Sequence, residues 1–578
     1  MSAIEVVIVF ASTTGVSEDA ARTFNTEITK AGFTTRLEDA GDVDPYEVVS
    51  SNQLIVFFTS TYGEGEFPAT GQELYKYLCN NAQPGELTHL KFAVFGIGSS
   101  NFPNFCRAGI DLESVLTSLG ANRIADLQTV DTSKPGVIDE CLENFTEEML
   151  SVLPSYAGEP SPPEPQPPIP RFRVVQSLGS MSQQADMPTI PGTKRVKLKS
   201  ITLKTANDYF RPVFHVVFEN NGFKYNIGDS ITLKPWNDPQ LVDKLIHKFG
   251  LNADDLVTIV SSDGKRKFPP RITWRQVFTE WLAIESVPQR KLCNDLSWYC
   301  QGDEKEKLLR WGSKDGTEEL SAYIKEGGRV ADLLLELSTL SMDPSMMVSL
   351  IPGQKSRLYS VASSPNVYPN EIHMVMVLVS YKTPNGKIRQ GVTSGYISRL
   401  YEQYSVTPSF LHYASIGMNP GTLKFVDDIE APIICFALGT GIAPFLAIFQ
   451  ERNRLIQQGK KIGNALVYIG CRHHDKDFLF KDQIEGYLQN GTITHLKTAF
   501  SHDQEQFITP LTKLEEDKET PVQYIKSPIF VFYYCGPGFG IPGKIEGVFA
   551  EIARANNIDP KNVVARAKKE FRWNVEAF

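Results

Sequence analysis

The stretch from residue 154 to residue 170 is the feature that most limits how this chain can fold. It holds eight prolines in 17 residues. Proline fixes one backbone dihedral and donates no backbone hydrogen bond, so a segment this rich in proline forms neither a helix interior nor a central strand. We therefore expect a semi-extended linker over residues 154–190, with separate folded regions on either side of it.

The region before this linker shows short apolar runs that alternate with amphipathic stretches. The apolar runs cover residues 4–10, 54–58 and 92–95. Buried parallel strands are typically apolar throughout, and the stretches between these runs have helical spacing. Residues 1–153 are therefore predicted to form a doubly wound α/β domain.

The region after the linker shows two patterns. From about residue 190 it is rich in strand-like segments, which give way to helical spacing over about 238–345 and then resume. This order predicts a β-barrel domain over residues 191–428 that is interrupted by a helical insert over about 238–345. From residue 429 to residue 578, apolar strands again alternate with helices, which predicts a second α/β domain. The expected fold class is α/β multidomain.

Composition narrows the classes of protein that this chain can be. Its 42% hydrophobic and 22% charged residues are ordinary for a globular protein. The eight cysteines include no Cys-x-x-Cys pair, which argues against a metal site, an iron–sulfur cluster or a disulfide framework. No apolar run approaches the ~18 residues of a membrane span, and the first strand begins almost at once. We expect no membrane anchor, no nucleic-acid partner and a cytoplasmic location, with an organelle matrix as the alternative.

Charge is divided unevenly along the chain. Residues 1–155 hold 22 acidic and 8 basic side chains, whereas the remainder holds 45 acidic and 50 basic ones. One interpretation is a solvated acidic surface. The other is a docking face for basic partners, which include the chain's own later domains.

Three loops of the first domain follow its predicted strands, where open parallel sheets bind ligands. The loop at 12–17 has hydroxyl side chains and a glycine at a helix start, which is typical of phosphate binding. The loops at 60–66 and 96–105 each add glycines and an aromatic ring that could stack on a planar heterocycle. Together they predict a flavin site. Its candidate residues are Ser12, Thr14, Gly15, Thr61, Tyr62, Gly63, Gly98 and Phe102.

A second flavin signature lies in the predicted barrel. We interpret Arg357, Tyr359 and Ser360 as alternating strand positions that supply a charge for pyrophosphate, a ring for isoalloxazine and a donor for its reactive edge. A predicted helix start that suits a phosphate follows. It consists of Gly391, Val392, Thr393 and Ser394.

The last domain has a glycine-rich turn between a predicted strand and a helix. Such a turn lets a dinucleotide's pyrophosphate meet helix N–H groups. Its residues are Gly439, Thr440 and Gly441, and two further strands are followed by Cys471-Arg472 and by Cys535.

Taken together, these motifs resemble those of the diflavin reductase family over residues 4–578. The resemblance implies a flavodoxin-like FMN domain, an FAD domain with a helical connecting insert, and a ferredoxin-reductase-like nicotinamide domain. It implies FMN, FAD and NADPH as cofactors. In the FMN domain it implies a phosphate site at Ser12, Thr14 and Gly15, ring stacking by Tyr62 and Phe102, and a ribityl or ring contact at Asp131.

The same resemblance implies roles around the FAD. Arg357 would pair with its phosphate and Tyr359 would stack on its ring, while Ser360 would lie near the reactive nitrogen. Three further residues are implied at the hydride path: Cys535 beside it, Glu576 in place of an acid that positions the chemistry, and Phe578 as the ring that covers the FAD.

The chain departs from this family at the expected 2′-phosphate site. Ser501 is retained, but His502 stands where relatives have Arg, and no Lys follows. A neutral imidazole supplies far less than a bidentate guanidinium. Asp503 and Glu505 are expected to repel a phosphate, and Arg472 could compensate, so a preference for NADPH over NADH is left open.

The expected function is an NADPH-dependent diflavin reductase whose electrons pass through FAD and FMN to a separate haem or iron–sulfur protein with a basic docking face. One alternative is an NADH-preferring reductase. Another is an electron-transfer module that docks to a partner complex and uses no nicotinamide.

Overall fold

The computed structural model describes residues 4–13, 15–62, 65–100, 104–132, 137–161, 166–176, 192–262, 268–408, 412–421, 423–426, 428–538 and 540–577. The chain divides into two compact units. The first consists mainly of the chain up to Gln166, and the second mainly of the chain from Pro167 to Glu576.

The first unit is built on a parallel sheet with the strand order β2-β1-β3-β4-β5, and β6 also pairs with β4. Its strands are β1 (Val6–Ala11), β2 (Thr35–Asp39), β3 (Leu54–Ser60), β4 (Lys91–Gly98), β5 (Asn122–Arg123) and β6 (Gln128–Asp131). Its helices are α1 (Val16–Lys30), α2 (Pro45–Ser51), η1 (Ala69–Gly71), α3 (Gln72–Asn80), α4 (Arg107–Ser118), α5 (Val137–Val152) and α6 (Pro154–Ala157).

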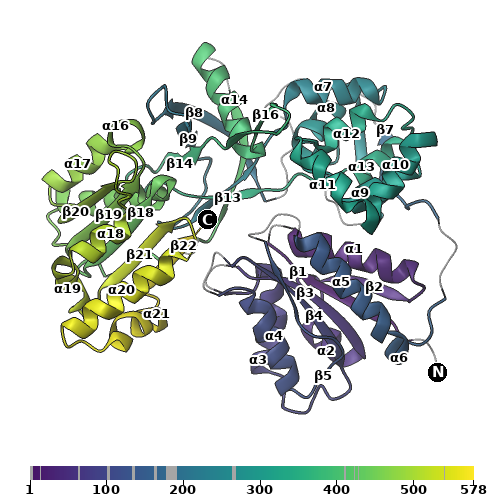
Figure 1. Cartoon of the computed structure of the whole chain (residues 1–578), viewed down its shortest axis with the longest axis horizontal. Coiled ribbons are helices and arrows are strands. Elements are labelled where there is room, and N and C mark those ends of the chain that lie inside the picture. The colour runs from purple at the N-terminus through teal and green to yellow at the C-terminus, as the bar shows by residue number, and fades with distance from the viewer. Residues whose placement is uncertain are drawn as a thin grey trace. The chain divides into compact units, whose positions relative to one another are not determined.

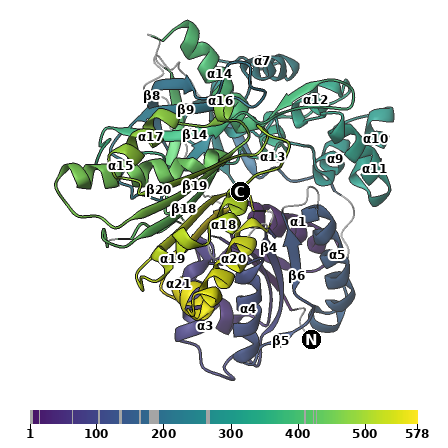
Figure 2. The ribbon, with the colours of Figure 1, turned by 60° about the vertical axis from the view of Figure 1, so that its left-hand side comes forward.

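Helices cover both faces of this sheet (Figures 1 and 2). One apolar core lies between the sheet and helices α1 and α5, and the other lies between the sheet and helices α2, α3 and α4. β1, β3 and β4 are buried on both faces because each carries apolar side chains at successive positions. This is the doubly wound arrangement that the sequence predicts.

The second unit begins with a six-stranded antiparallel sheet of order β13-β10-β17-β8-β9-β14 that encloses an apolar core. The strands of this sheet are β8 (Lys194–Leu203), β9 (Val213–Glu219), β10 (Ser230–Lys234), β13 (Arg357–Ser360), β14 (Glu371–Val377) and β17 (Tyr413–Asn419). Between β14 and β17 lie the helix α14 (Val392–Val406) and a two-stranded sheet of β15 (Ser380–Lys382) and β16 (Ile388–Gln390). A bulge between Leu198 and Ser200 bends β8.

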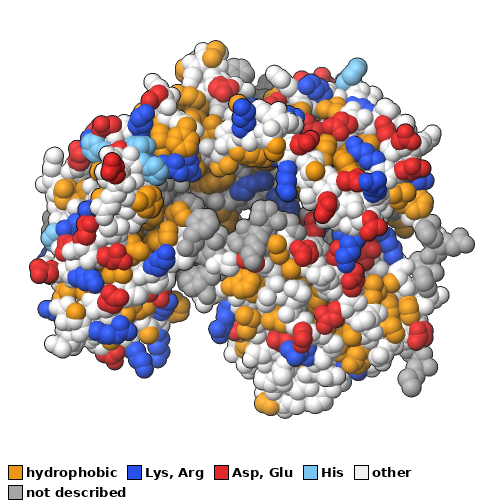
Figure 3. Space-filling view, viewed as in Figure 1, with side chains coloured by type: hydrophobic (Ala, Val, Ile, Leu, Met, Phe, Trp, Pro, Cys, Tyr) orange, Lys and Arg blue, Asp and Glu red, His pale blue; other side chains and the backbone are white. Residues whose placement is uncertain are grey.

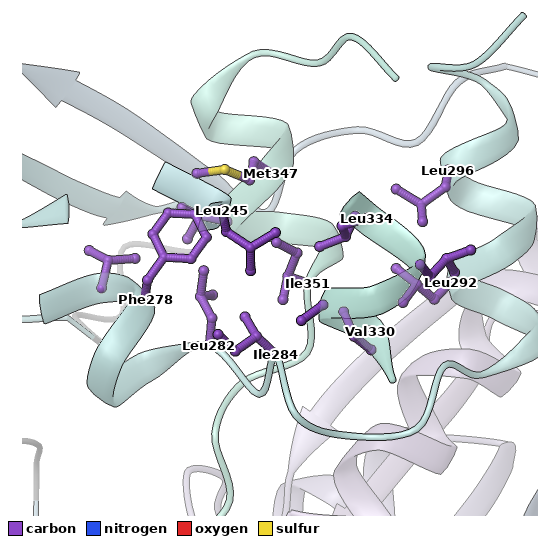
Figure 4. Packing of buried hydrophobic residues seen from close by; sticks show 14 of the residues in the cluster. Leu245, Phe278, Leu282, Ile284, Leu292, Leu296, Val330, Leu334, Met347 and Ile351 are labelled. Carbon is purple, nitrogen blue, oxygen red and sulfur yellow. The ribbon is translucent and has the colours of Figure 1, made fainter. Parts of the chain in front are cut away.

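A helical insert separates β10 from β13 in the sequence. Its elements are α7 (Pro239–Lys248), β11 (Leu256–Ser261), β12 (Ile272–Thr273), α8 (Trp274–Gln276), a π-helical turn η3 (Val277–Trp281), α9 (Arg290–Ser297), α10 (Gly302–Gly312), η4 (Lys314–Gly316), α11 (Thr317–Lys325), α12 (Val330–Glu336) and α13 (Pro344–Leu350). Leu245, Phe278 and Leu334 are among the buried side chains that meet in its core (Figure 4). Burying one such side chain stabilises a fold by about 1.5–3 kcal/mol.

Part of the predicted linker is a strand. β7 (Phe172–Gln176) pairs antiparallel with β11 and so joins the insert's small sheet, of order β12-β11-β7. The prolines end at residue 170, and the segment Phe-Arg-Val-Val-Gln that follows has the β-branched composition of an edge strand.

The rest of the second unit is an α/β region with the strand order β20-β19-β18-β21-β22, in which the first four strands run parallel. Its elements are β18 (Ile433–Leu438), η5 (Gly439–Ile442), α15 (Ala443–Gln457), β19 (Ala465–Cys471), α16 (His474–Asp477), α17 (Lys481–Gln489), β20 (His495–Phe500), α18 (Pro510–Glu516), α19 (Glu519–Ile525), β21 (Val531–Gly536), α20 (Ile541–Ala555), η6 (Lys561–Ala565), α21 (Arg566–Lys569) and β22 (Trp573–Ala577). Across the described residues of both units, the helices are too short or too polar to cross a bilayer.

Candidate functional site

The first unit brings its predicted ligand loops to one edge of its sheet. β1 and β3 are neighbouring parallel strands, so the loops that follow them leave the sheet side by side. In the strand order 2-1-3-4-5, the chain adds strands on one side of β1 and then, from β3 on, on the other side. Open parallel sheets bind ligands at this switch point, which here lies between β1 and β3.

The loop after β1 is shaped for a phosphate. The Ser12 hydroxyl accepts a hydrogen bond from the Gly15 backbone N–H (2.9 Å), and the Ser12 N–H donates to Thr70 Oγ1 (3.0 Å). Gly15 is the N-cap residue of α1 and has a φ of 88°, so no side chain caps this helix. Ser17, in the first turn of α1, has a fully buried hydroxyl with no hydrogen-bond partner. Open helix N–H groups beside an unused hydroxyl fit an anion.

The loops after β3 and β4 are held by backbone contacts. Thr61 Oγ1 accepts from the Ala108 N–H (3.3 Å), and the Tyr62 N–H donates to the Glu66 carbonyl (2.8 Å) in a tight turn. A Cβ on Gly98 would lie 2.6 Å from the Cys106 nitrogen, so no larger residue fits there.

Asp131 ends β6 and takes part in ordering the loop beside it. Its Oδ1 accepts a hydrogen bond from the Ser100 N–H (2.9 Å). The predicted residues Thr14, Gly63 and Phe102 lie outside the described residues. Of the two aromatic residues predicted to stack on the flavin ring, Tyr62 is therefore the one that the structure describes.

In the second unit, β13 corrects one part of the sequence interpretation. Tyr359 and Ser360 are consecutive in a strand that pairs antiparallel with β10, so their side chains leave opposite faces. Arg357 and Tyr359 share one face, and Ser360 lies on the other. The three side chains therefore do not form one alternating row.

The face of Arg357 and Tyr359 meets the start of α14 and fits a pyrophosphate. Arg357 donates to the Lys355 carbonyl (2.7 Å) and has no ion-pair partner among the described residues, while burial lowers its pKa. Burial raises the pKa of Tyr359, and the nearby Thr393 hydroxyl acts in the opposite direction. A partly buried cation on the strand face that reaches α14 through Tyr359, together with the uncapped start of this 15-residue helix, suits a doubly charged anion.

Two of the predicted α14 residues have local structural contacts. Ser394 Oγ accepts from the Val379 N–H (3.1 Å) and donates to the Gly391 carbonyl (3.3 Å). A Cβ on Gly391 would lie 3.0 Å from that hydroxyl, so glycine fits best there. Val392 begins the helix, and Thr393 follows it, buried.

Ser360 meets two side chains from other strands. Its hydroxyl donates to Glu576 Oε1 (3.0 Å), and the Cys535 thiol donates to Glu576 Oε2 (3.7 Å). Burial raises the pKa of Glu576, although both hydrogen bonds favour its ionised form, and burial together with the Glu576 charge holds the pKa of the Cys535 thiol well above its usual value. One carboxyl group thus positions a hydroxyl and a thiol from β13 and β21. Phe578 lies outside the described residues.

The turn after β18 has the form that a dinucleotide requires. Gly439 has a φ of 56°, and Thr440 follows it in the turn before α15. A Cβ on Gly441 would lie 2.0 Å from the Cys535 carbonyl oxygen, so only glycine lets β18 and β21 end this close together.

The neighbouring strands β19 and β20 end in the residues predicted to contact the nucleotide. Cys471 pairs with Phe500 in the sheet, so Arg472 and the Ser501-His502 pair follow adjacent strand ends. The Arg472 guanidinium lies 5.2 Å from the centre of the Phe210 ring, and Ser501 Oγ is 2.8 Å from His502 Nδ1. Burial raises the pKa of Cys471, which therefore stays a neutral thiol.

Asp503 is not the free repelling charge that the sequence suggests. Its Oδ1 lies 2.8 Å from His473 Nδ1, and its Oδ2 accepts from the His474 backbone N–H (2.7 Å). His473 is the residue of these sites that sequence reasoning missed, whereas Ser17 lay in the predicted loop at 12–17 without being named as a candidate. The position of His473, directly after Cys471-Arg472 at a strand end, was the available signal.

Three protein-family models match this chain. They are a flavodoxin domain over residues 8–145, an FAD binding domain over 195–396, and an oxidoreductase NAD-binding domain over 436–539. Together with the geometry above, they define a flavin-dependent oxidoreductase that uses a nicotinamide dinucleotide.

Known proteins are similar to this chain over nearly its whole length. The NADPH–cytochrome P450 reductase of Musca domestica is 28% identical over 97% of this chain and 87% of its own length. The NADPH-dependent diflavin oxidoreductase 1 of Danio rerio is 28% identical over 94% of each chain. A mitochondrial pyruvate dehydrogenase [NADP(+)] of Euglena gracilis is 27% identical over 99% of this chain but only 31% of its own length. These matches support the diflavin reductase family for this chain, and the matched domains support the predicted cofactors FMN, FAD and NADPH.

Proposed function

We propose that this protein accepts electrons from NADPH and passes them through FAD and FMN to a separate redox protein. The order of the matched domains and the names of the similar reductases support this proposal. The observation that carries it is the carboxyl group of Glu576, which holds Ser360 and Cys535 where β13 meets the ends of β21 and β22.

The residues act by binding, orientation and proton placement. Bound flavin supplies the capacity to accept a hydride and to release single electrons. Arg357 and the start of α14 would hold the FAD pyrophosphate, and Tyr359 would pack against the ring. Glu576 fixes the direction of the Ser360 hydroxyl, which would leave the Ser360 oxygen to accept a hydrogen bond from the reacting edge of a bound flavin.

In the first unit, the start of α1 would hold the FMN phosphate, with Ser12 and Gly15 shaping the loop. Tyr62 would stack on the ring, and Gly98 would allow the chain to pass close to it. Asp131 supports this edge through Ser100.

Rapid anaerobic mixing with NADPH and with NADH tests the function. We expect the flavin absorbance to bleach with NADPH, and to bleach more slowly with NADH. Faster bleaching with NADH would favour the NADH-preferring alternative. Absence of bleaching with either nucleotide would favour an electron-transfer module that uses no nicotinamide.

The acceptor is proposed to be a haem or iron–sulfur protein with a basic docking face, because the chain up to residue 155 has a net charge of −14. The similar reductases named for cytochrome P450 support a haem acceptor. Capture on the immobilised holoprotein at low salt, followed by assay of each captured protein as an electron acceptor, tests this. We propose a cytoplasmic location, which imaging of a fluorescent fusion would test.

A further inference from the structure

Three histidines gather where β19 and β20 end. His473 and His474 follow β19 and begin α16, and His502 follows β20. The rings of His473 and His502 lie 5.7 Å apart. Figure 3 shows histidine side chains grouped on the surface near α16. This group is called the histidine cluster below.

The cluster lies where the fold places the ribose of a bound dinucleotide. The pyrophosphate of such a ligand sits at the turn after β18, and the next strand ends toward the adenosine ribose. In this chain β19 is that strand, and β20 pairs with it. Arg472 and the Ser501-His502 pair follow these two strand ends. They would therefore lie near the ribose of a bound dinucleotide, where a 2′-phosphate distinguishes NADPH from NADH.

The hydrogen atom on His473 can be assigned from its neighbours. The His474 backbone N–H, as the main cause, lowers the pKa of Asp503, so Asp503 is ionised and can only accept hydrogen bonds. His473 Nδ1 must therefore carry a hydrogen and donate it to Asp503 Oδ1. In the neutral ring the other nitrogen, Nε2, then has no hydrogen to donate. Only a protonated His473 can donate from Nε2 to a phosphate.

The other charged groups around the cluster are mostly paired. His474 Nδ1 contacts Asp475 (2.5 Å), and Lys476 pairs with Asp208 (2.8 Å). Asp477 accepts from the backbone N–H groups of Arg472 and His473 and from the Tyr209 hydroxyl. The Arg211 charge acts on Tyr209, whose ring lies 6.2 Å from that of His473.

Arg472 is a permanent cation of this site, with Arg211 nearby, and the histidines add charge only when they take up protons. We propose that His473 and His502 read the 2′-phosphate in their protonated forms, so that discrimination between NADPH and NADH weakens as pH rises. This inference rests on the proposed function, since it concerns the same nicotinamide site. The inference names His473 and His502 as residues that select the nucleotide, and protonation as the means.

The proposal predicts that phosphate binding draws protons onto the cluster. Histidine changes charge between pH 5 and 8, and uptake of one proton per bound ligand changes affinity by at most about tenfold per pH unit. Adenosine 2′,5′-bisphosphate and 5′-AMP differ only in the 2′-phosphate. We expect their affinity ratio for the holoprotein to fall by roughly tenfold or more between pH 6.8 and 8.5. This range lies above the second ionisation of a phosphate ester, near pH 6.

Isothermal titration calorimetry in two buffers of different ionisation enthalpy measures both affinity and proton uptake. We expect one to two protons taken up with the bisphosphate and none with 5′-AMP at pH 7.5. The variants His473→Gln and His502→Gln should each flatten the pH dependence, and the double variant should abolish it. His247→Gln, on α7 of the insert, is the control and should behave as wild type.

A ratio that does not change with pH, or proton uptake that survives in the double variant, would overturn the proposal. Binding of neither nucleotide at millimolar concentration would overturn it as well. These measurements need no turnover, so anaerobic flavin bleaching still judges the proposed function separately.

Discussion

At the scale of single residues, the arrangement around Glu576 shows what sequence comparison supplies and what it leaves out. The resemblance named Ser360, Cys535 and Glu576 as partners in one reaction. Ser360 leaves the strand face opposite Tyr359 because the two residues are consecutive in β13. The contact between Ser360 and Glu576 spans 216 positions of sequence and follows from tertiary structure alone.

Replacing the carboxyl group of Glu576 should slow the reaction. In Glu576→Gln the amide still accepts one hydrogen bond but cannot accept from both Ser360 and Cys535 or hold a proton. We expect flavin reduction by NADPH to slow by roughly 100-fold, the size of a typical proton-placement effect. Stopped-flow absorbance measures this rate. Glu551→Gln, on α20, is the control, and a rate within twofold of wild type in Glu576→Gln would contradict the role.

The pH dependence of the same rate reports the ionisation of Glu576. Its folded-state pKa is raised by burial, so the carboxylate is lost at a higher pH than an ordinary glutamate, whose pKa is about 4.3. We expect flavin reduction to decline as pH falls through a value above 4.3, and Glu576→Gln to lack this decline. An unchanged acid limb in the variant would assign it to another group.

At the scale of elements, the glycines of the turn after β18 have different reasons for being glycine. Sequence alone marked Gly439, Thr440 and Gly441 as a phosphate turn. The structure adds that Gly439 needs a positive φ, whereas Gly441 needs room beside the Cys535 carbonyl. The second reason could not be predicted, because it arises from the adjacent ends of β18 and β21.

These two glycines give a matched pair of variants. Gly439→Ala strains only the backbone, at a cost of about 1–2 kcal/mol, since no atom lies within 4 Å of the added Cβ. Gly441→Ala forces β18 and β21 apart. We expect Gly441→Ala to lower the Tm more and to raise the KM for NADPH at least tenfold, as measured by thermal denaturation and steady-state kinetics. Equal effects of the two variants would contradict the packing account.

The arrangement of strands and helices explains the other differences between the sequence predictions and the structure. Strand and helix regions of both α/β domains follow from apolar periodicity, which is strong there. β7 was missed because the prolines before it dominate the composition of the segment. The Asp503–His473 pair was missed because it depends on β19 lying beside β20.

At the scale of the whole molecule, buried histidines should make the protein sensitive to acid. Burial lowers the pKa of His215 to about 3, and burial also lowers the pKa of His373, whose ring lies 5.0 Å away. The unfolded chain protonates His215 near pH 6.5, but the folded chain does not until about pH 3. Stability contributed by neutral His215 is therefore present above pH 6.5 and falls by up to about 1.4 kcal/mol per pH unit below it.

Thermal denaturation between pH 7.5 and 4.5 tests this dependence. We expect the Tm of wild type to fall more steeply with acid than that of His215→Gln, which has no group to protonate there. His247→Gln should follow wild type. Parallel curves for wild type and His215→Gln would show that other groups dominate acid unfolding.

The uneven charge of the chain makes a further prediction. If the acidic first unit attracts a basic acceptor, added salt should slow electron delivery, because the Debye length falls from about 30 Å at 0.01 M to about 3 Å at 1 M. We expect kcat/KM for the acceptor to fall roughly tenfold or more over this range. The rate of flavin bleaching measured without acceptor is the control for salt effects on the nicotinamide site.

The pairing of β7 with β11 limits how far the two units can separate. Only 14 residues lie between the end of α6 at Ala157 and the start of β7 at Phe172. A fully extended chain covers at most about 3.6 Å per residue, so this connection reaches about 50 Å, whereas a free connection over residues 154–190 would reach more than twice as far. By pairing with β11, β7 shortens the connection that is free to move. It confines the flavodoxin-like unit to a smaller volume and raises its effective concentration at the FAD-bearing unit.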